Sequence, residues 1–245
     1  MEPGSAIWRF RKLEFLALSM FLFACWTYSY NSVWKTEVLF WADNVKKSPA
    51  LPRTYANYGA MLIKAGDYSK AHKALDKALT FKPGDVRTLY NKGAAYEGEK
   101  NYKEAIKYYS KALKINPKFA DAWSSQGNVL VEIGYIDEGL QCLYAAWELQ
   151  PFDTVVNYRL GHTLMITNNS KGAMFHLHRA EKSNPYYINA LLDLGLIYTI
   201  LNNDEVANSY FSRVKRLDPS NKLANDMLKM KSFGKSSSGI IKKIK

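Results

Sequence analysis

Apolar residues recur every three or four positions along most of the chain, in short stretches separated by polar turns. This spacing places them on one face of an amphipathic α-helix. The stretches come in pairs, and a proline, which cannot continue a helix, closes each pair. The pattern predicts an all-α chain built from antiparallel helix pairs.

The closing prolines are evenly spaced. Six of the eight prolines lie 34 residues apart, at Pro49, Pro83, Pro117, Pro151, Pro185 and Pro219. A fixed period of this length is the signature of a repeat array. Aligned on it, the chain contains five repeats, numbered 1 to 5 here: 52–85, 86–119, 120–153, 154–187 and 188–221. Position 8 of every repeat is glycine and position 20 is alanine or glycine, so the two helices of a pair can cross closely.

Repeat 2 carries the clearest family signature. Its residues 88–117, TLYNKGAAYEGEKNYKEAIKYYSKALKINP, closely resemble the tetratricopeptide repeat. Repeat 3 keeps Trp123 at position 4 but has Gly139 where the family prefers alanine. Repeat 4 departs furthest, with Asn157 and Asn168 in place of the usual aromatic residue and turn glycine.

The resemblance covers about residues 32–231 and implies a right-handed superhelix of five full helix-turn-helix repeats. An N-terminal half repeat, 35–51, and a capping helix, 222–233, would close its two ends, as repeat arrays require. The family is a scaffold that binds proteins or peptides. The resemblance therefore implies a protein-binding scaffold without a cofactor and without enzymatic activity.

The half repeat follows from Pro49, which stands where a closing proline belongs. Residues 32–48 before it are then a second helix without a first. Trp34, Val38, Trp41 and Val45 lie on one face of that helix. We expect this face to pack against the first helix of repeat 1.

Residues 15–34 contain no charge over 20 positions, about the length that spans a bilayer. They predict a transmembrane or signal-anchor helix after a basic segment, 1–14. The aromatic residues predicted at the membrane interface are Trp26, Tyr28, Tyr30 and Trp34. A cleaved signal peptide, a lipoprotein signal ending at Cys25 and a buried helix are the alternatives for this segment.

Basic residues suggest an orientation. Arg9, Arg11 and Lys12 precede the uncharged segment, whereas Lys35 alone follows it closely. The positive-inside rule then favours a cytoplasmic N-terminus, with the repeats on the non-cytoplasmic side: periplasm, extracellular space or lumen.

The junction between this segment and the repeats carries a second resemblance. Asn31, Trp34, Glu37, Leu39 and Trp41 are similar to the span-to-repeat region of O-mannosyltransferase-like membrane glycosyltransferases. This resemblance implies an alternative function, an accessory or fragment of such an enzyme whose repeats position an acceptor protein.

The net charge of +12 is concentrated at the C-terminus. The segment 222–245 has seven lysines against the single acid Asp226, whereas the repeats are almost balanced. We interpret 234–245 as a disordered basic tail that aids solubility. Contact with anionic lipid or nucleic acid, and a dilysine retrieval signal in KKIK, are the weaker alternatives.

The sequence offers no catalytic or metal-binding constellation. It contains no glycine-rich phosphate loop, no G-x-S-x-G elbow and no H-E-x-x-H motif. Cys25 and Cys142 are not expected to pair. His176 and His178 are two residues apart and therefore point to different faces of a helix. We predict no metal, no cofactor and no catalytic residue.

The family resemblance places a partner-binding groove along helix A, the first helix of each repeat. Positions 2, 5, 6 and 9 of that helix supply the candidate groove residues: Arg53, Asn57, Arg87, Tyr90, Asn91, Asn128, Tyr158, Arg159, His162 and Asp193. Amides can bond both donors and acceptors of an extended peptide, and tyrosines offer flat apolar area. The two-carboxylate clamp of chaperone-tail binders is not predicted, because only Asn91 matches it.

Overall fold

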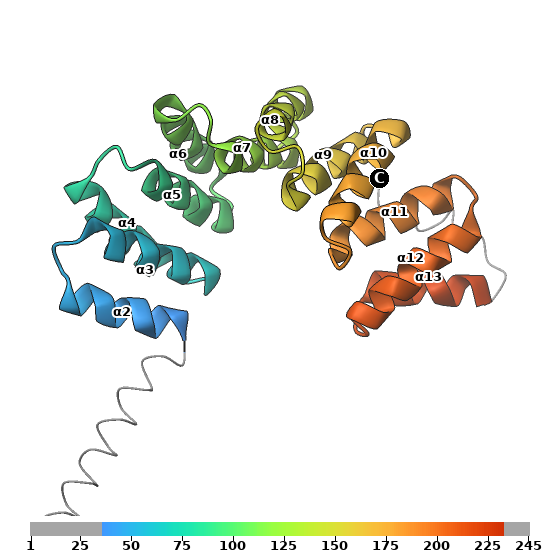
Figure 1. Ribbon diagram of the computed structural model, residues 1–245, viewed down its shortest axis with the longest axis horizontal. Helices are drawn as coiled ribbons and strands as arrows, with labels where there is room; N and C mark the ends of the chain where they lie inside the picture. Colours follow the sequence, from blue (N-terminus) through green and yellow to red (C-terminus); the bar gives the residue numbers. More distant parts are fainter. Residues whose placement is uncertain (1–35, 233–245) are drawn as a thin grey trace, which may run out of the picture. The chain divides into compact units, whose positions relative to one another are not determined.

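The computed structural model describes residues 36–232, and the regular structure in that range is entirely α-helical (Figure 1). The helices are α2 (Glu37–Lys47), α3 (Pro52–Lys64), α4 (Tyr68–Phe81), α5 (Val86–Gly98), α6 (Tyr102–Ile115), α7 (Ala120–Glu132), α8 (Ile136–Leu149), α9 (Thr154–Ile166), α10 (Ser170–Ser183), α11 (Ile188–Ile200), α12 (Asp204–Leu217) and α13 (Lys222–Ser232). They divide between two compact units, with the boundary between Glu99 and Lys100. Unit 1 holds α2 to α5, and unit 2 holds α6 to α13. The predicted all-helical repeat fold is confirmed.

The predicted membrane span has no counterpart here. No described helix is long and apolar enough to cross a bilayer. The longest have 14 residues, about 21 Å at 1.5 Å per residue, against roughly 30 Å of hydrocarbon. Residues 15–34, with Trp26, Tyr28, Tyr30 and Trp34, lie outside the described range. The transmembrane helix, and the single-pass location with a cytoplasmic N-terminus, are therefore wrong as statements about the described chain.

Every repeat turns between its two helices at the same place. Position 15 adopts a left-handed backbone in all five, at Gly66, Lys100, Gly134, Asn168 and Asn202, with φ between 57° and 93°. In repeat 1 the amide of Gly66 donates to the carbonyl of Ile63, and the next amide donates to the carbonyl of Leu62. These two bonds form a Schellman motif, which satisfies the last carbonyls of helix A.

The residue after this corner begins the second helix, helix B. Asp67, Asn101, Asn169 and Asn203 each accept a hydrogen bond from a backbone amide in the first turn of helix B. Such N-caps each contribute about 1 kcal/mol. The short polar pair at positions 15 and 16 therefore ends one helix and starts the next.

The glycines at position 8 allow the two helices of a repeat to approach closely. A Cβ on Gly127 in α7 would lie 2.8 Å from the carbonyl oxygen of Gly139 in α8, and a Cβ on Gly139 would lie 2.9 Å from the carbonyl oxygen of Gly127. These backbone atoms cannot move aside as a side chain can. Repeat 3 has glycine where the family prefers alanine because its two helices meet at this point.

Helices α2 and α13 cover the ends of their own units. Val38 of α2 packs against Leu62 and Ala74 in unit 1. In α13, Ala224 and Met227 are buried in the core of unit 2. Helix α2 begins at Glu37, five residues after the start at residue 32 that the sequence predicted for this helix.

Candidate functional site

The first helices of repeats 3, 4 and 5 present one continuous face in unit 2. Helix α9 packs against both α7 and α11, so residues at positions 5 and 6 of neighbouring helices can meet. Seven residues on or beside this face make two groups of contacts, which we call together the helix A cluster. Arg159 contacts Ser124 and Ser125, and the other group is Tyr158, His162, Tyr187 and Asp193.

Arg159 is held by hydroxyl groups rather than by a carboxylate. Its Nη1 donates to Oγ of Ser124 at 2.9 Å and to Oγ of Ser125 at 3.3 Å. Both serines are buried, and no carboxylate among the described residues lies within ion-pair distance of this guanidinium. Neutral partners fix the position of the side chain but leave its charge uncompensated, so it can bind a carbonyl or carboxylate oxygen.

His162 and Asp193 form a pair between α9 and α11. The Nδ1 atom of His162 lies 2.7 Å from Oδ2 of Asp193. The hydrogen bond to Asp193 raises the pKa of His162, although burial acts in the opposite direction. Asp193 is buried, whereas 43% of the His162 side chain is exposed. The carboxylate therefore supports a protonated imidazole that faces solvent.

Two tyrosines complete the cluster. The ring of Tyr158 lies 5.7 Å from that of His162 and 5.2 Å from that of Tyr187, between ring centroids. Burial, with the nearby charge of Asp193, raises the pKa of Tyr158, and burial also raises that of Tyr187. Both hydroxyls stay protonated near neutral pH, so the cluster combines hydrogen-bond donors with flat apolar surface.

The candidate residues of the sequence fall into both units. Arg53 and Asn57 of α3, with Arg87, Tyr90 and Asn91 of α5, belong to unit 1. The two arginines are exposed, and the other three residues are partly buried. The two packed helices carry Asn57 and Asn91 in the same register.

In unit 2 the structure brings Tyr158, His162 and Asp193 together, whereas Arg159 bonds Ser124. Asn128 lies partly buried on α7. The sequence-based prediction missed three members of the cluster. Ser124 and Ser125 occupy positions 5 and 6, so the register itself could have found them. Tyr187 precedes α11 in a position normally used for capping, and no sequence signal identifies it.

Among residues 36–232, no three histidine, cysteine, aspartate or glutamate side chains converge as ligands for a metal ion. Cys142 is a buried free thiol, and burial raises its pKa. His176 and His178 have separate partners, Asn157 and Glu181 respectively.

Comparison with known families gives the chain its class. Residues 52–85 and 86–119 each match a model of the tetratricopeptide repeat. This chain is a tetratricopeptide repeat protein. The same helix pair recurs in repeats 3, 4 and 5, whose sequences depart further from the family pattern.

Tetratricopeptide repeat proteins of several kinds are similar to it. Hsp70-Hsp90 organizing protein 3 of Arabidopsis thaliana is 30% identical over 124 residues, 51% of this chain and 22% of that protein. Protein O-mannosyl-transferase TMTC3 of Homo sapiens is 26% identical over 159 residues, 63% of this chain and 17% of that protein. The chain thus spans about a fifth of the length of these relatives.

A solved structure with the same fold is that of YrrB, described as a TPR protein with an unusual peptide-binding site. It has a TM-score of 0.56 and 23% sequence identity, and the match covers 77% of this chain and 97% of YrrB.

Proposed function

We propose that this tetratricopeptide repeat protein is a protein-binding scaffold, and that the helix A cluster of unit 2 holds an extended peptide segment of its partner. The observation that carries the proposal is the uncompensated guanidinium of Arg159, fixed by Ser124 and Ser125. A side chain that is already held in place loses little conformational entropy when a ligand binds.

The chemistry of the cluster defines the expected peptide. Arg159 donates hydrogen bonds to carbonyl or carboxylate oxygens, and His162 can do the same when it is protonated, the form that Asp193 favours. Tyr158 and Tyr187 contact apolar side chains. The peptide-binding site of YrrB and the organizing role named for Hsp70-Hsp90 organizing protein 3 support a protein-binding scaffold. The chaperone-tail clamp is still not expected, because Ala56, Asp121 and Ser125 replace its residues.

A peptide-display library selected on the immobilised full chain tests the proposal. We expect the recovered peptides to lose at least tenfold in affinity when Arg159→Gln is introduced, about 1.4 kcal/mol. Lys171→Gln is the matched control, because Lys171 is an exposed cation of α10 that lies outside helix A in unit 2. Equal affinities for both variants and the unchanged chain would rule out the helix A cluster as the binding site.

A second candidate function rests on the similarity to the mannosyltransferase. In this proposal the repeats present an acceptor protein to a glycosyltransferase that another polypeptide supplies. It predicts that the chain, added to a purified O-mannosyltransferase, raises the rate of mannosyl transfer onto a protein that the cluster binds. If Arg159→Gln abolishes that increase in rate, the result supports this function. If the transferase works at the same rate with and without the chain, the result rejects it.

A further inference from the structure

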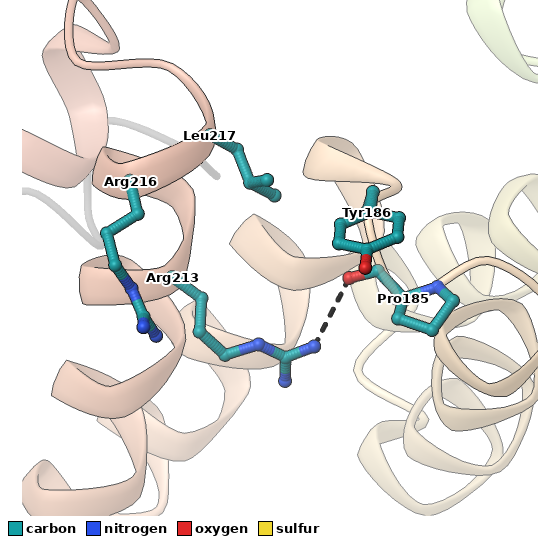
Figure 2. A pocket seen from close by; sticks show the side chains of 5 residues that line it. All are labelled: Pro185, Tyr186, Arg213, Arg216 and Leu217. Carbon is teal, nitrogen blue, oxygen red and sulfur yellow. Dashed lines mark hydrogen bonds between the residues drawn. The ribbon is translucent and has the colours of Figure 1, made fainter.

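A small hollow lies in unit 2 away from the helix A cluster. It has a volume of about 250 Å³ and lies where the end of α12 faces the loop between α10 and α11. Arg213, Arg216 and Leu217 of α12 form one side, and Pro185 and Tyr186 form the other (Figure 2). The lining contains two arginines and no acidic residue.

The side chain of Arg213, which lines this hollow, is held in place by hydrogen bonds. Its Nη2 donates to the carbonyl oxygen of Pro185 at 3.2 Å, as the dashed line in Figure 2 marks. Its Nη1 forms an ion pair with Glu181, which also bonds His178 at 3.2 Å and the hydroxyl of Tyr210 at 3.1 Å. The guanidinium is therefore turned toward α10 and the loop.

The same register one repeat earlier holds an arginine with more aromatic neighbours. Arg179 occupies position 26 of repeat 4, as Arg213 does in repeat 5, and its Nη2 donates to the carbonyl oxygen of Pro151 at 2.9 Å. Three aromatic rings surround its guanidinium: Phe152 at 4.9 Å, Phe175 at 5.4 Å and Trp147 at 5.8 Å from guanidinium carbon to ring centroid. Here the chain supplies all the aromatic contacts itself.

In repeat 5 two of those three rings are missing, and a different residue, Tyr210, supplies a ring with its centroid 5.4 Å from the guanidinium carbon of Arg213. Tyr186 takes the position of Phe152, but Ser209 stands in place of Phe175 and Glu181 in place of Trp147. Tyr186 is 73% exposed, about as much as Phe152 of repeat 4 at 76%. Arg216 makes no hydrogen bond or ion pair with any described residue. The second site thus has fewer rings around its inner arginine than repeat 4 has, and it has no anion for its outer arginine.

We propose that this hollow binds a partner protein through an aromatic side chain that has a carboxylate beside it. The partner's ring would take the space between Tyr186 and Leu217 and lie against the guanidinium of Arg213, as the chain's own rings lie against Arg179. The partner's carboxylate would pair with Arg216. A cavity of about 150 Å³ can hold benzene, so 250 Å³ accommodates one aromatic side chain but not a typical cofactor.

Charge excludes the chain's own C-terminal segment as the occupant. Residues 233–245 contain four lysines and no acidic residue, so they would be repelled by Arg213 and Arg216. An acidic segment of another protein can pair with Arg216, whereas Arg213 already pairs with Glu181.

The tripeptide Ac-Glu-Phe-Glu-NH2, titrated into the full chain and followed by residue-resolved NMR, tests the proposal. Arg159→Gln is introduced throughout, so that binding at the helix A cluster does not contribute. We expect saturable shifts confined to residues 185–187 and 213–217. Arg216→Glu should weaken binding at least fivefold, and Arg216→Gln should weaken it by a smaller factor.

Lys215→Glu is the matched control. It changes the charge by the same amount as Arg216→Glu, one residue away, but Lys215 does not line the hollow. It should change the affinity less than twofold. Shifts that do not saturate, equal shifts with Ac-Lys-Phe-Lys-NH2, or equal weakening by Lys215→Glu would each overturn the proposal. None of these results bears on the helix A cluster.

Discussion

Repeat 1 of unit 1 and repeat 4 of unit 2 share one length and one hairpin shape, but they fix the start of helix A by different means. At position 4, Tyr55 of repeat 1 stacks on the ring of Phe81 at 6.1 Å between centroids. The same position of repeat 4 is Asn157, which is completely buried. Its Nδ2 donates to the carbonyl oxygens of Pro151 at 2.9 Å and Asp153 at 2.8 Å.

Every polar atom of the Asn157 side-chain amide has a hydrogen-bond partner, because a histidine lies next to its oxygen. Its Oδ1 lies 3.2 Å from Nδ1 of His176, which replaces the Ala74 of repeat 1. With both Nδ2 hydrogens donated, Oδ1 is the acceptor and Nδ1 of His176 carries the hydrogen. A buried polar pair is stable when every group has a partner. The departures of repeat 4 from the family pattern are therefore a polar substitute for an aromatic contact.

The largest expected effect comes from breaking this pair on one side. Asn157→Leu leaves the buried N–H of His176 without an acceptor, which should lower the free energy of unfolding by about 2–3 kcal/mol. The double variant Asn157→Leu, His176→Leu removes both partners and should recover at least half of that loss. Urea denaturation followed by circular dichroism measures both values.

Tyr55→Leu in repeat 1 is the control, because it removes a ring contact without exposing a buried polar group. Its expected cost is about 1 kcal/mol. If the double variant of repeat 4 is no more stable than Asn157→Leu alone, the two repeats differ less than the hydrogen bonds indicate.

Lowering the pH tests the same difference between repeats 1 and 4, with a smaller expected effect on stability. Burial, with the charge of Arg179, lowers the pKa of His176 to about 4, from roughly 6.5 in an unfolded chain. The unfolded state then binds more protons between these values, so stability falls as pH drops from about 6.5 to 4. Linkage gives a loss of about 2 kcal/mol at pH 5 relative to pH 8.

His176→Gln keeps an amide that can donate to Asn157 but removes the titrating group. In this variant the free energy of unfolding should fall less between pH 6.5 and pH 4, because the contribution of His176 is absent. Urea denaturation at a series of pH values measures the difference. An unchanged pH profile in the variant would assign the acid sensitivity to other groups.

The smallest effect concerns the helix A faces of the two units. Asp193 raises the pKa of His162, so the pair contributes stability that is complete below the unfolded value of about 6.5 and is lost as pH rises through the folded value. Because 43% of the His162 side chain is exposed, solvent screens the pair and the loss should stay below about 1 kcal/mol.

His162→Gln should remove this alkaline decline, and NMR titration of the imidazole in the unchanged chain measures the pKa itself. Unit 1 has Asn57 and Asn91 on its corresponding face, and neither amide titrates. A measured pKa at or below 6.5 for His162 would remove the electrostatic difference between the two faces.

The period of 34 residues was sufficient to predict the helix pairs, because closing prolines and position 8 glycines act through local geometry. The polar links between repeats could not be predicted in the same way. Arg159 reaches Ser124 and Ser125 across 35 and 34 residues, and short serine side chains leave no periodic pattern. Asn157 departs from the family pattern, and its three partners, Pro151, Asp153 and His176, are brought to it only by the fold.

The uncharged segment shows the opposite error. The length and composition of residues 15–34 predicted a membrane helix, yet low charge is shared by many kinds of segment. The described helices gain their stability from packing against neighbours, a property that composition alone does not report.

The left-handed corner at position 15 has a consequence for how such chains evolve. Its shape is held by backbone amides, such as those of Asn168 to Met165 and Asn169 to Leu164 in repeat 4, and the side chain contributes little to it. Glycine, asparagine and even Lys100 occupy the same corner. Substitutions can therefore accumulate at this corner over generations while the hairpin is retained. Sequence similarity between related repeats is then lost well before structural similarity.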